Sequence, residues 1–332
     1  MSGSPIDGAA VVLADLDGVI YRGPAAIPYA VESMNAIDPS IRVGYITNNA
    51  SRTDVTVAAH LAKLGLRVEP GEVVTSSQAA VRLLAQLVPA ASTVLVVGGD
   101  GLTSELERAG FTVTRSAEDL PAAVIQGFAP EVGWLQLAEA AFALKPSASA
   151  EIPWVATNTD WTIPQARGTA PGNGTLVSAV HTAVGRLPIV AGKPEVAIFE
   201  EAFSRFGSRD AIMIGDRLDT DILGANRAGI RSIFVLTGID QAKQLLAAAP
   251  NERPTFILND LRELHEPYPL TEVREERGAV LTSVGDATVK RTGLEIAVEQ
   301  GSGINLLRAG AAAIWSAPAA IYALEVPPEL YS

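Results

Sequence analysis

Short apolar runs alternate with helical patterns through the first 260 residues of the chain. A run of four or five apolar residues is typical of a strand buried on both faces, and apolar residues three or four apart are typical of a helix. Strands and helices that alternate in this way build a mainly parallel sheet with helices on both faces. The predicted strands are residues 10–14, 43–46, 94–97, 154–156, 212–214 and 232–235.

Two helices can be placed by the residues at their ends. One runs from about Val55 to Leu64 and stops at Gly65, a residue type favoured just past a helix C-terminus. The other starts at Pro194, which suits a first helical turn, and stops at Gly207.

The composition narrows the classes of function. Hydrophobic residues make up 48% of the chain and charged residues 19%, which is enough apolar material for a core. A net charge of −12 argues against binding to nucleic acid or an anionic membrane. The chain has no cysteine, which excludes disulfides and thiolate chemistry and fits a cytoplasmic location. We expect no secretory signal in residues 1–10 and no membrane insertion of the apolar stretch 304–324, which Arg308 and Pro318 interrupt.

Two carboxylates stand where the first predicted strand ends. Asp15 and Asp17 follow an apolar run, and Gly18 allows the chain to turn. Side chains two apart on a strand point the same way, and repulsion between neighbouring acids pushes their pKa values apart. One acid can then stay ionised while the other holds a proton. Taken alone, such a pair is equally well explained as a turn or a helix cap.

Polar residues also follow two later apolar runs. Thr47, Asn48 and Asn49 precede a helix whose free N–H groups can bind an anion, although plain helix capping explains them as well. Lys193 stands directly before a helix, where the helix dipole does not favour a cation. Its position indicates an anionic partner, with an ordinary surface lysine as the alternative.

Three acids, Asp216, Asp219 and Asp221, follow the apolar run 211–214 within six residues. Buried acids so close together are costly unless a cation lies among them, and carboxylate oxygens suit Mg²⁺. The alternative is a capped helix start with two exposed acids. Four polar segments at four strand ends nevertheless favour a ligand site, because parallel sheets bind ligands outside the carboxyl ends of their strands.

These segments resemble the four ordered motifs of the haloacid dehalogenase superfamily. The motifs here are Asp15-x-Asp17-Gly-Val, Thr47-Asn48-Asn49, Gly192-Lys193-Pro194 and Gly215-Asp216-x-x-x-Thr220-Asp221-Ile222. Two further segments, Tyr21-Arg22-Gly23 and Pro171-Gly172-x-Gly174, resemble its NagD-like class IIA branch of phosphatases. The resemblance covers about residues 8–260, and the spelling is most similar to that of glycerol-3-phosphate phosphatases.

The resemblance implies a Mg²⁺-dependent phosphatase that hydrolyses a small phosphate monoester. Glycerol 3-phosphate, and with it glycerophospholipid metabolism, is the first choice; 2-phosphoglycolate, pyridoxal phosphate and nucleotide monophosphates are the alternatives. Asp15 would attack phosphorus to form an aspartyl-phosphate, and Asp17 would protonate the leaving alkoxide and then deprotonate water. The metal set would be Asp15, the Asp17 carbonyl and Asp216, supported by Asp221, which would orient Lys193 or the metal's water shell, and by Gly18. The substrate set would be Thr47, Asn48, Asn49 and Lys193.

The resemblance also implies a domain organisation. A three-layer, Rossmann-like α/β core (residues 1–91 and 189–265) would be interrupted by an α/β cap of C2 type (residues 92–188). In the cap, Asp160 and Arg167 would lie near the substrate; the alternative places Trp161 in the cap core and Arg167 on the surface. The segment 98–101 lacks the full Gly-x-Gly-x-x-Gly pattern, so it predicts a tight turn between strand and helix.

Residues 271–332 extend past the usual end of this branch and predict a small α+β appendage. It is β-rich over residues 278–300, followed by one helix and a final extended piece, an order faintly similar to half of an acetyltransferase fold. The acidic run 272–277 predicts a solvated face. We expect the appendage to pack on the core or to form a dimer interface, so that a homodimer would use either the cap or the appendage.

Three other classes of function compete with hydrolysis. They are a signalling receiver phosphorylated on Asp15, a non-catalytic binding protein on the same fold, and a phosphomutase. Asp17 and the predicted cap argue against the receiver. Net release of inorganic phosphate would separate a phosphatase from all three.

Overall fold

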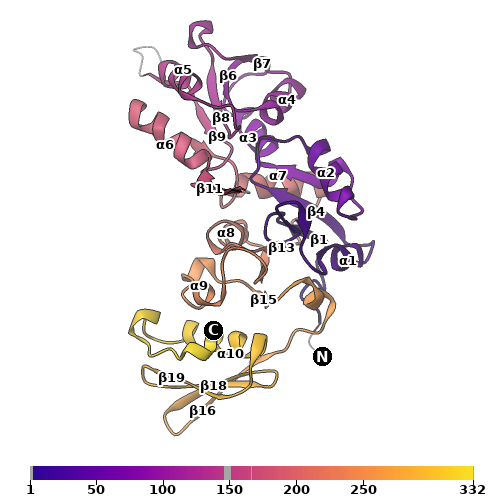
Figure 1. The fold of residues 1–332 in the computed structure, drawn as a ribbon, viewed down its shortest axis with the longest axis vertical. Helices are drawn as coiled ribbons and strands as arrows, with labels where there is room; N and C mark the ends of the chain where they lie inside the picture. Colours follow the sequence, from indigo (N-terminus) through magenta and orange to yellow (C-terminus); the bar gives the residue numbers. More distant parts are fainter. Residues whose placement is uncertain (1–2, 146–150, 166, 332) are drawn as a thin grey trace. The chain divides into compact units, whose positions relative to one another are not determined.

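The computed structural model describes residues 3–145, 151–165 and 167–331, which form two compact units (Figure 1). The first unit comprises Met1–Ile41 and Asp210–Ser332, and the second comprises Arg42–Arg209. All six predicted strands are present within two residues of their expected bounds, and the fold is mixed α/β with mainly parallel sheets. The predicted fold class is therefore confirmed.

A parallel sheet forms the centre of the first unit. Its strands lie in the order β15 (Phe256–Leu258), β14 (Arg231–Val235), β13 (Ala211–Gly215) and β1 (Val11–Ala14). Every residue of β1 and β13 is buried, which is why both strands are continuous apolar runs rather than alternating ones. The unit also contains α1 (Ala30–Asn35), α8 (Leu223–Ala228), α9 (Ala242–Leu246) and a small hairpin of β2 (Tyr21–Arg22) and β3 (Ala25–Ala26).

The predicted appendage is an antiparallel sheet with one helix. Its strands follow sequence order: β16 (Thr271–Glu276), β17 (Ala279–Val284), β18 (Ala287–Thr292) and β19 (Glu295–Gln300), and α10 (Gly303–Trp315) comes next. All six residues of β16 are exposed, as the acidic run predicted. The prediction that the chain ends in an extended segment is wrong. The 3₁₀ turns Ile321–Ala323 and Pro328–Leu330 lie there, and Glu325 makes a single bridge to Glu295.

The appendage shares one hydrophobic core with the parallel sheet. Buried apolar side chains of β14 and α9 pack in a single cluster with those of β17, β18, β19 and α10. Figure 1 shows α10, in yellow, between the antiparallel sheet and α9. Arg308 of α10 is only 7% exposed and donates to the Ile257 carbonyl of β15 at 2.8 Å and to the Glu263 carboxylate. The appendage is thus part of the folded body of the first unit.

The second unit contains two groups of parallel strands. In the first group, β4 (Arg42–Thr47) pairs with β5 (Val73–Thr75), with α2 (Asp54–Lys63), α3 (Ser76–Leu84) and α7 (Val196–Phe206) nearby. The helix predicted to start at Pro194 starts instead at Val196, because Glu195 is the extended N-cap residue. It ends before Gly207, and α2 ends before Gly65, as predicted. Both glycines have positive φ.

The second group is a five-stranded parallel sheet in the order β12-β9-β8-β6-β7. Gly99 caps the helix that follows β6, so segment 98–101 is the expected tight turn. The predicted cap boundaries at residues 92 and 188 fall within this unit and stay a prediction. The elements are β6 (Thr93–Val97), α4 (Asp100–Arg108), β7 (Thr112–Thr114), β8 (Ala123–Gln126), α5 (Trp134–Leu144), β9 (Trp154–Ala156), β10 (Thr162–Gln165), β11 (Gly168–Pro171), α6 (Asn173–Val184) and β12 (Ile189–Val190).

Among the described residues, every helix is too short or too polar to cross a bilayer. The apolar stretch that begins near residue 304 lies mostly in α10, which is packed into the core of the first unit.

Candidate active site

Parallel pairing of β1 with β13 brings two acidic loops together. Residues 11–14 lie opposite residues 211–214, so Asp15 and Asp216 follow neighbouring strands. The Asp15 amide donates to the Ile214 carbonyl at 2.9 Å, which fixes the backbone of Asp15 at the strand end. Asp15 is 9% exposed and Asp216 is fully buried. The two acids therefore lie at one edge of the sheet with little access to bulk water.

The structure brings three carboxylates into one cluster. One oxygen from each of Asp15, Asp216 and Asp221 lies within 4.8 Å of the other two. Three carboxylates so close and so little hydrated repel one another strongly unless a cation lies among them. Hard oxygen donors are the ligands that Mg²⁺ prefers, so this donor set fits that ion. The cluster contains two of the predicted metal ligands and, in addition, the predicted supporting residue Asp221.

Asp221 also holds the loop on which it stands. Its Oδ2 accepts hydrogen bonds from the amides of Asp216 at 3.2 Å and Arg217 at 3.1 Å. Asp219, the other acid of this loop, forms an exposed ion pair with Arg217 at 2.8 Å. The nearby Asp240 carboxylate accepts from the Leu218 amide, and burial raises its pKa despite that hydrogen bond. Two backbone amides thus hold the Asp221 carboxylate in place.

Asp17 and Gly18 occupy the turn after Asp15. The Asp17 side chain is exposed and accepts from the Tyr21 hydroxyl at 3.3 Å. Gly18 has φ of +88°, a conformation that residues with a side chain rarely adopt, and its amide donates to the Tyr21 carbonyl at 2.9 Å. An exposed carboxylate beside a buried one suits proton exchange with a leaving group and with water.

In the second unit, the side chain of Asn48 is the centre of a hydrogen-bond network. Its Nδ2 donates to the Asp160 carboxylate at 3.1 and 3.2 Å and to the Lys193 carbonyl at 3.0 Å. Its Oδ1 accepts from the Lys193 amide at 2.8 Å. One amide side chain thereby joins the predicted second motif, the predicted third motif and the predicted cap loop.

Lys193 and Thr47 are both buried. Lys193 is 3% exposed, and its Nζ lies 3.5 Å from the Ile46 carbonyl at the end of β4. The Thr47 hydroxyl accepts from the Asn49 amide at 3.1 Å, and the Asn49 side chain accepts from the Ser51 amide at 2.9 Å. Asn49 therefore caps its own turn, which is the local role that the sequence left open. Anionic or carbonyl oxygens around a buried ammonium group offset the cost of its burial. The charge and the burial of Lys193 therefore fit a role in binding an anion.

The loop after β9 places Asp160 beside Asn48. Asp160 is partly buried, whereas Trp161 is 65% exposed and so does not belong to the core of this unit. Arg167 is exposed at the turn between β10 and β11. Sequence reasoning missed Asn158, whose side chain donates to the Asn48 carbonyl at 2.7 Å. The buried Asn173 supports it by donating to the Asn158 carbonyl at 2.8 Å.

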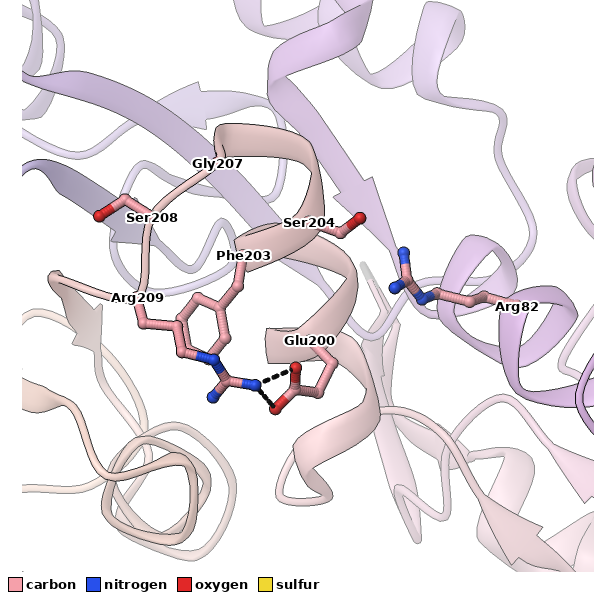
Figure 2. A pocket seen from close by; sticks show the side chains of 7 residues that line it. All are labelled: Arg82, Glu200, Phe203, Ser204, Gly207, Ser208 and Arg209. Atoms are coloured by element: carbon pink, nitrogen blue, oxygen red, sulfur yellow. Dashed lines mark hydrogen bonds and ion pairs between the residues drawn. The ribbon is translucent and has the colours of Figure 1, made fainter.

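Two cavities lie elsewhere in the second unit. One of about 290 Å³ is lined by α7 and the residues that follow it, together with Arg82. Figure 2 shows the Arg209 guanidinium against the Glu200 carboxylate there, and the same guanidinium lies 5.0 Å from the Phe203 ring centre. The other, of about 410 Å³, is lined by residues of α2, α3, α4 and α7. Neither cavity is lined by a predicted site residue, so we place the candidate chemistry at the strand ends instead.

Comparison with protein families gives two matches. A model described as haloacid dehalogenase-like hydrolase matches residues 12–112, and a second, described as HAD-hydrolase-like, matches residues 190–264. The chain is 44% identical over 315 residues to the D-glycerol 3-phosphate phosphatase of Mycobacterium tuberculosis (strain ATCC 25618 / H37Rv), an alignment that covers 93% of this chain and 86% of the relative. It is 34% identical to the glycerol-3-phosphate phosphatase of Gallus gallus, with coverage of 73% and 84%.

Solved structures give the same picture. The crystal structure of a glycerol phosphate phosphatase from Mycobacterium tuberculosis in complex with magnesium superposes with a TM-score of 0.83 at 40% identity. That match covers 96% of this chain and 93% of the other, and it therefore includes the C-terminal appendage. The p-nitrophenyl phosphatase from Archaeoglobus fulgidus superposes with a TM-score of 0.70 at 26% identity, covering 78% of this chain.

Proposed function

Because the chain belongs to the haloacid dehalogenase-like hydrolase family, we propose that it is a Mg²⁺-dependent phosphatase whose substrate is glycerol 3-phosphate. The observation that carries this proposal is the buried cluster of Asp15, Asp216 and Asp221, with the exposed Asp17 two residues after Asp15. The cluster supplies a nucleophile and cation ligands, and Asp17 supplies a proton carrier. The similarity to the two glycerol phosphate phosphatases supports the choice of substrate.

In the proposed mechanism, a carboxylate oxygen of Asp15 attacks phosphorus while the bond between phosphorus and the ester oxygen breaks. Asp17 donates its proton to the leaving alkoxide, which departs as glycerol. Asp17, now ionised, takes a proton from water, the water oxygen attacks the aspartyl-phosphate, and inorganic phosphate leaves with Asp15 restored. Bound Mg²⁺ neutralises negative charge on the transferring group.

We assign the phosphoryl oxygens to Lys193, Thr47 and the Asn48–Asn49 turn. Lys193 supplies the positive charge that a chain with a net charge of −12 needs locally in order to hold a phosphate dianion. The Asn48 side chain orients Lys193 by accepting from the Lys193 backbone amide, and it orients Asp160 by donating to the Asp160 carboxylate. Asp160, a hydrogen-bond acceptor held beside these groups, is our candidate for contact with a hydroxyl of the substrate. Arg167 stays a prediction with no support from its exposed position.

Phosphate release from a panel of monoesters tests the proposal. The panel is glycerol 3-phosphate, 2-phosphoglycolate, pyridoxal 5′-phosphate and AMP, each with Mg²⁺, with a chelator, and with Asp15→Asn. We expect the fastest release from glycerol 3-phosphate, and a loss of about a thousandfold or more in the variant, because an amide is a poor nucleophile of the same shape.

Other outcomes would redirect the assignment. Faster release from another panel member would replace the substrate and keep the enzyme class. No release from any member would contradict a phosphatase and leave the receiver, the phosphomutase and the binding protein as alternatives. Labelling of Asp15 by a phosphoryl donor would then separate the first two, which are phosphorylated there, from the binding protein.

Two further assignments also stay predictions. We propose a cytoplasmic location, which fractionation of cells measures. We also propose a homodimer formed through the cap or the appendage, which sedimentation of the purified chain measures.

A further inference from the structure

The loop between β14 and α9, residues 236–241, contacts both acidic loops of the candidate site. No sequence motif had drawn attention to it. Its Ile239 amide donates to the Asp216 carboxylate at 2.7 Å, and its Asp240 amide lies 3.3 Å from the Asp216 carbonyl. Its Thr237 hydroxyl donates to the Gly18 carbonyl at 2.7 Å. One short loop therefore fixes the residue after Asp17 and the buried acid Asp216 at the same time.

The loop approaches Asp216 so closely that only glycine fits. A Cβ atom on Gly238 would lie 1.8 Å from Asp216 Oδ2, and one on Gly18 would lie 2.3 Å from the same oxygen. The carboxylate of Asp216 thus packs against the backbones of Gly18 and Gly238, which follow different strands. This packing and the hydrogen bond from Ile239 limit rotation about the Asp216 Cβ–Cγ bond.

Thr237 acts on the other acidic loop through Gly18. The Gly18 amide donates to the Tyr21 carbonyl, and the Gly18 carbonyl accepts from Thr237, so both peptide groups around this residue are held. The peptide that carries the Asp17 carbonyl, the proposed metal ligand, is the one that ends in the Gly18 amide. Thr237 is itself anchored, because Arg22 donates to the Thr237 carbonyl and Gln241 donates to the Gly238 carbonyl at 2.8 Å.

We propose that Thr237 is a positioning residue for the metal site: its hydroxyl fixes the turn at Gly18 and keeps the Asp17 carbonyl and the Asp216 carboxylate in register for one cation. This inference rests on the proposed metal set. Residues that orient ligands in this way typically change metal affinity by tenfold or more when they are removed. The hydroxyl contacts neither substrate nor cation in this scheme; it acts through the backbone.

The test compares Thr237→Val, which keeps the shape and loses the donor, with Thr237→Ser, which keeps the donor. Calorimetric titration with MgCl₂ alone, without substrate, gives the dissociation constant of the cation. We expect about a tenfold rise for Thr237→Val and a change within about twofold for Thr237→Ser. The Mg²⁺ concentration for half-maximal phosphate release should rise in parallel, with KM for substrate little changed.

Thr282→Val is the matched control. Thr282 is fully buried in β17 of the same unit, so its replacement makes the same chemical change away from the acidic loops. We expect no change in Mg²⁺ binding. An unchanged dissociation constant in Thr237→Val, or an equal rise in Thr237→Ser, would overturn the inference.

A second variant guards against misfolding. Arg22 is exposed, and Arg22→Met removes the donor to the Thr237 carbonyl without opening the core. We expect a rise of about threefold in the Mg²⁺ dissociation constant, less than for Thr237→Val because one contact of the loop remains. No rise would count against the inference even if Thr237→Val did not fold.

The outcome is separable from that of the proposed function. Mg²⁺ binding that weakens in Thr237→Val upholds the inference even if no panel phosphate is hydrolysed. Hydrolysis of glycerol 3-phosphate by the natural chain, with unchanged Mg²⁺ binding in both Thr237→Val and Arg22→Met, upholds the function and overturns the inference.

Discussion

The acidic loops of the first unit and the Asn48 network of the second unit are built in different ways. In the acidic loops, backbone amides hold the side chains: Asp221 accepts from two amides and Asp216 from one. In the Asn48 network, side-chain groups join segments more than a hundred residues apart in the chain. Amides in loops at the ends of paired strands are placed by the sheet itself, whereas a network of side chains also depends on the identity and orientation of every polar group in it.

This difference has an energetic consequence. Backbone amides at a strand end are placed by the sheet itself, so they are already oriented before a cation binds. Buried side-chain networks depend on every member, because a donor or acceptor left without its partner costs about 1–3 kcal/mol. We therefore expect the acidic loops to lose their geometry when a side chain fills the space beside their backbone. We expect the Asn48 network to lose its geometry when one polar atom is exchanged.

Among the variants that test this comparison, we expect the largest effect from Gly215→Ala, which fills backbone space beside Asp221. A Cβ atom there would lie 2.1 Å from the Asp221 Cβ, so Asp221 must shift from its place in the cluster with Asp15 and Asp216. We expect the Mg²⁺ dissociation constant, measured by calorimetry, to rise by about a hundredfold. The free energy of unfolding should fall by about 1–3 kcal/mol because the strand end is overpacked.

Gly71→Ala is the control for that change, because a Cβ at Gly71 meets open space. It should leave both quantities unchanged. Unaltered Mg²⁺ binding in Gly215→Ala would mean that Asp221 is not needed for the metal site, and the acid cluster would reduce to Asp15 and Asp216.

A smaller loss is expected from Asn48→Asp. The change places a carboxylate against Asp160 and removes the donor to the Lys193 carbonyl, so the loop and the lysine shift apart. We expect kcat/KM for glycerol 3-phosphate to fall by about thirtyfold, since a displacement of an ångström can cost a hundredfold. Binding of Mg²⁺ should change by less than about twofold if the acidic loops are positioned independently.

Reversing the pair sharpens that test. In Asn48→Asp with Asp160→Asn, the amide and carboxylate exchange places and one hydrogen bond between them is restored. We expect the double variant to recover part of the lost kcat/KM. A double variant no better than Asn48→Asp alone would show that the two residues act separately.

The difference between the acidic loops and the Asn48 network also explains which parts of the site could be predicted from the sequence. Asp15 and Asp216 could be predicted because each stands at the end of an apolar run, so the strand that positions it is visible in the sequence. Asp17 and Asp221 were predicted because they follow these two acids in the same segments. The strands themselves were predicted well, since a strand buried on both faces is apolar at every position. The role of Asp221 was less well predicted, because its hydrogen bonds to the loop backbone depend on a π-helical turn at Leu218–Ile222.

Contacts between distant segments were not readable. Asn158 lies in a segment that drew attention for Asp160, yet only the folded loop shows that its amide donates to the Asn48 carbonyl. Thr237 and Gly238 follow a predicted strand, and a Thr-Gly pair there reads as an ordinary turn. Only the folded structure shows that Gly238 packs against the Asp216 carboxylate. The last residues were misread as extended because Pro and Ala runs carry no clear period.

We expect the smallest effect on turnover from a change at Arg308 of α10. This buried guanidinium pairs with Glu263, donates to the Ile257 carbonyl and lies 4.4 Å from the Tyr268 ring centre. Arg308→Met leaves Glu263 without its partner and the Ile257 carbonyl without a donor, so we expect a loss of about 3 kcal/mol in the free energy of unfolding measured with urea. Turnover at 25 °C should stay unchanged, because the acidic loops keep their own backbone hydrogen bonds.

Arg262→Met is the control. It removes an exposed ion pair with Asp260 and should lower the free energy of unfolding far less. A loss of turnover in Arg308→Met without a loss of stability would mean that α10 helps to position the acidic loops, and the appendage would then belong to the catalytic body and not only to its core.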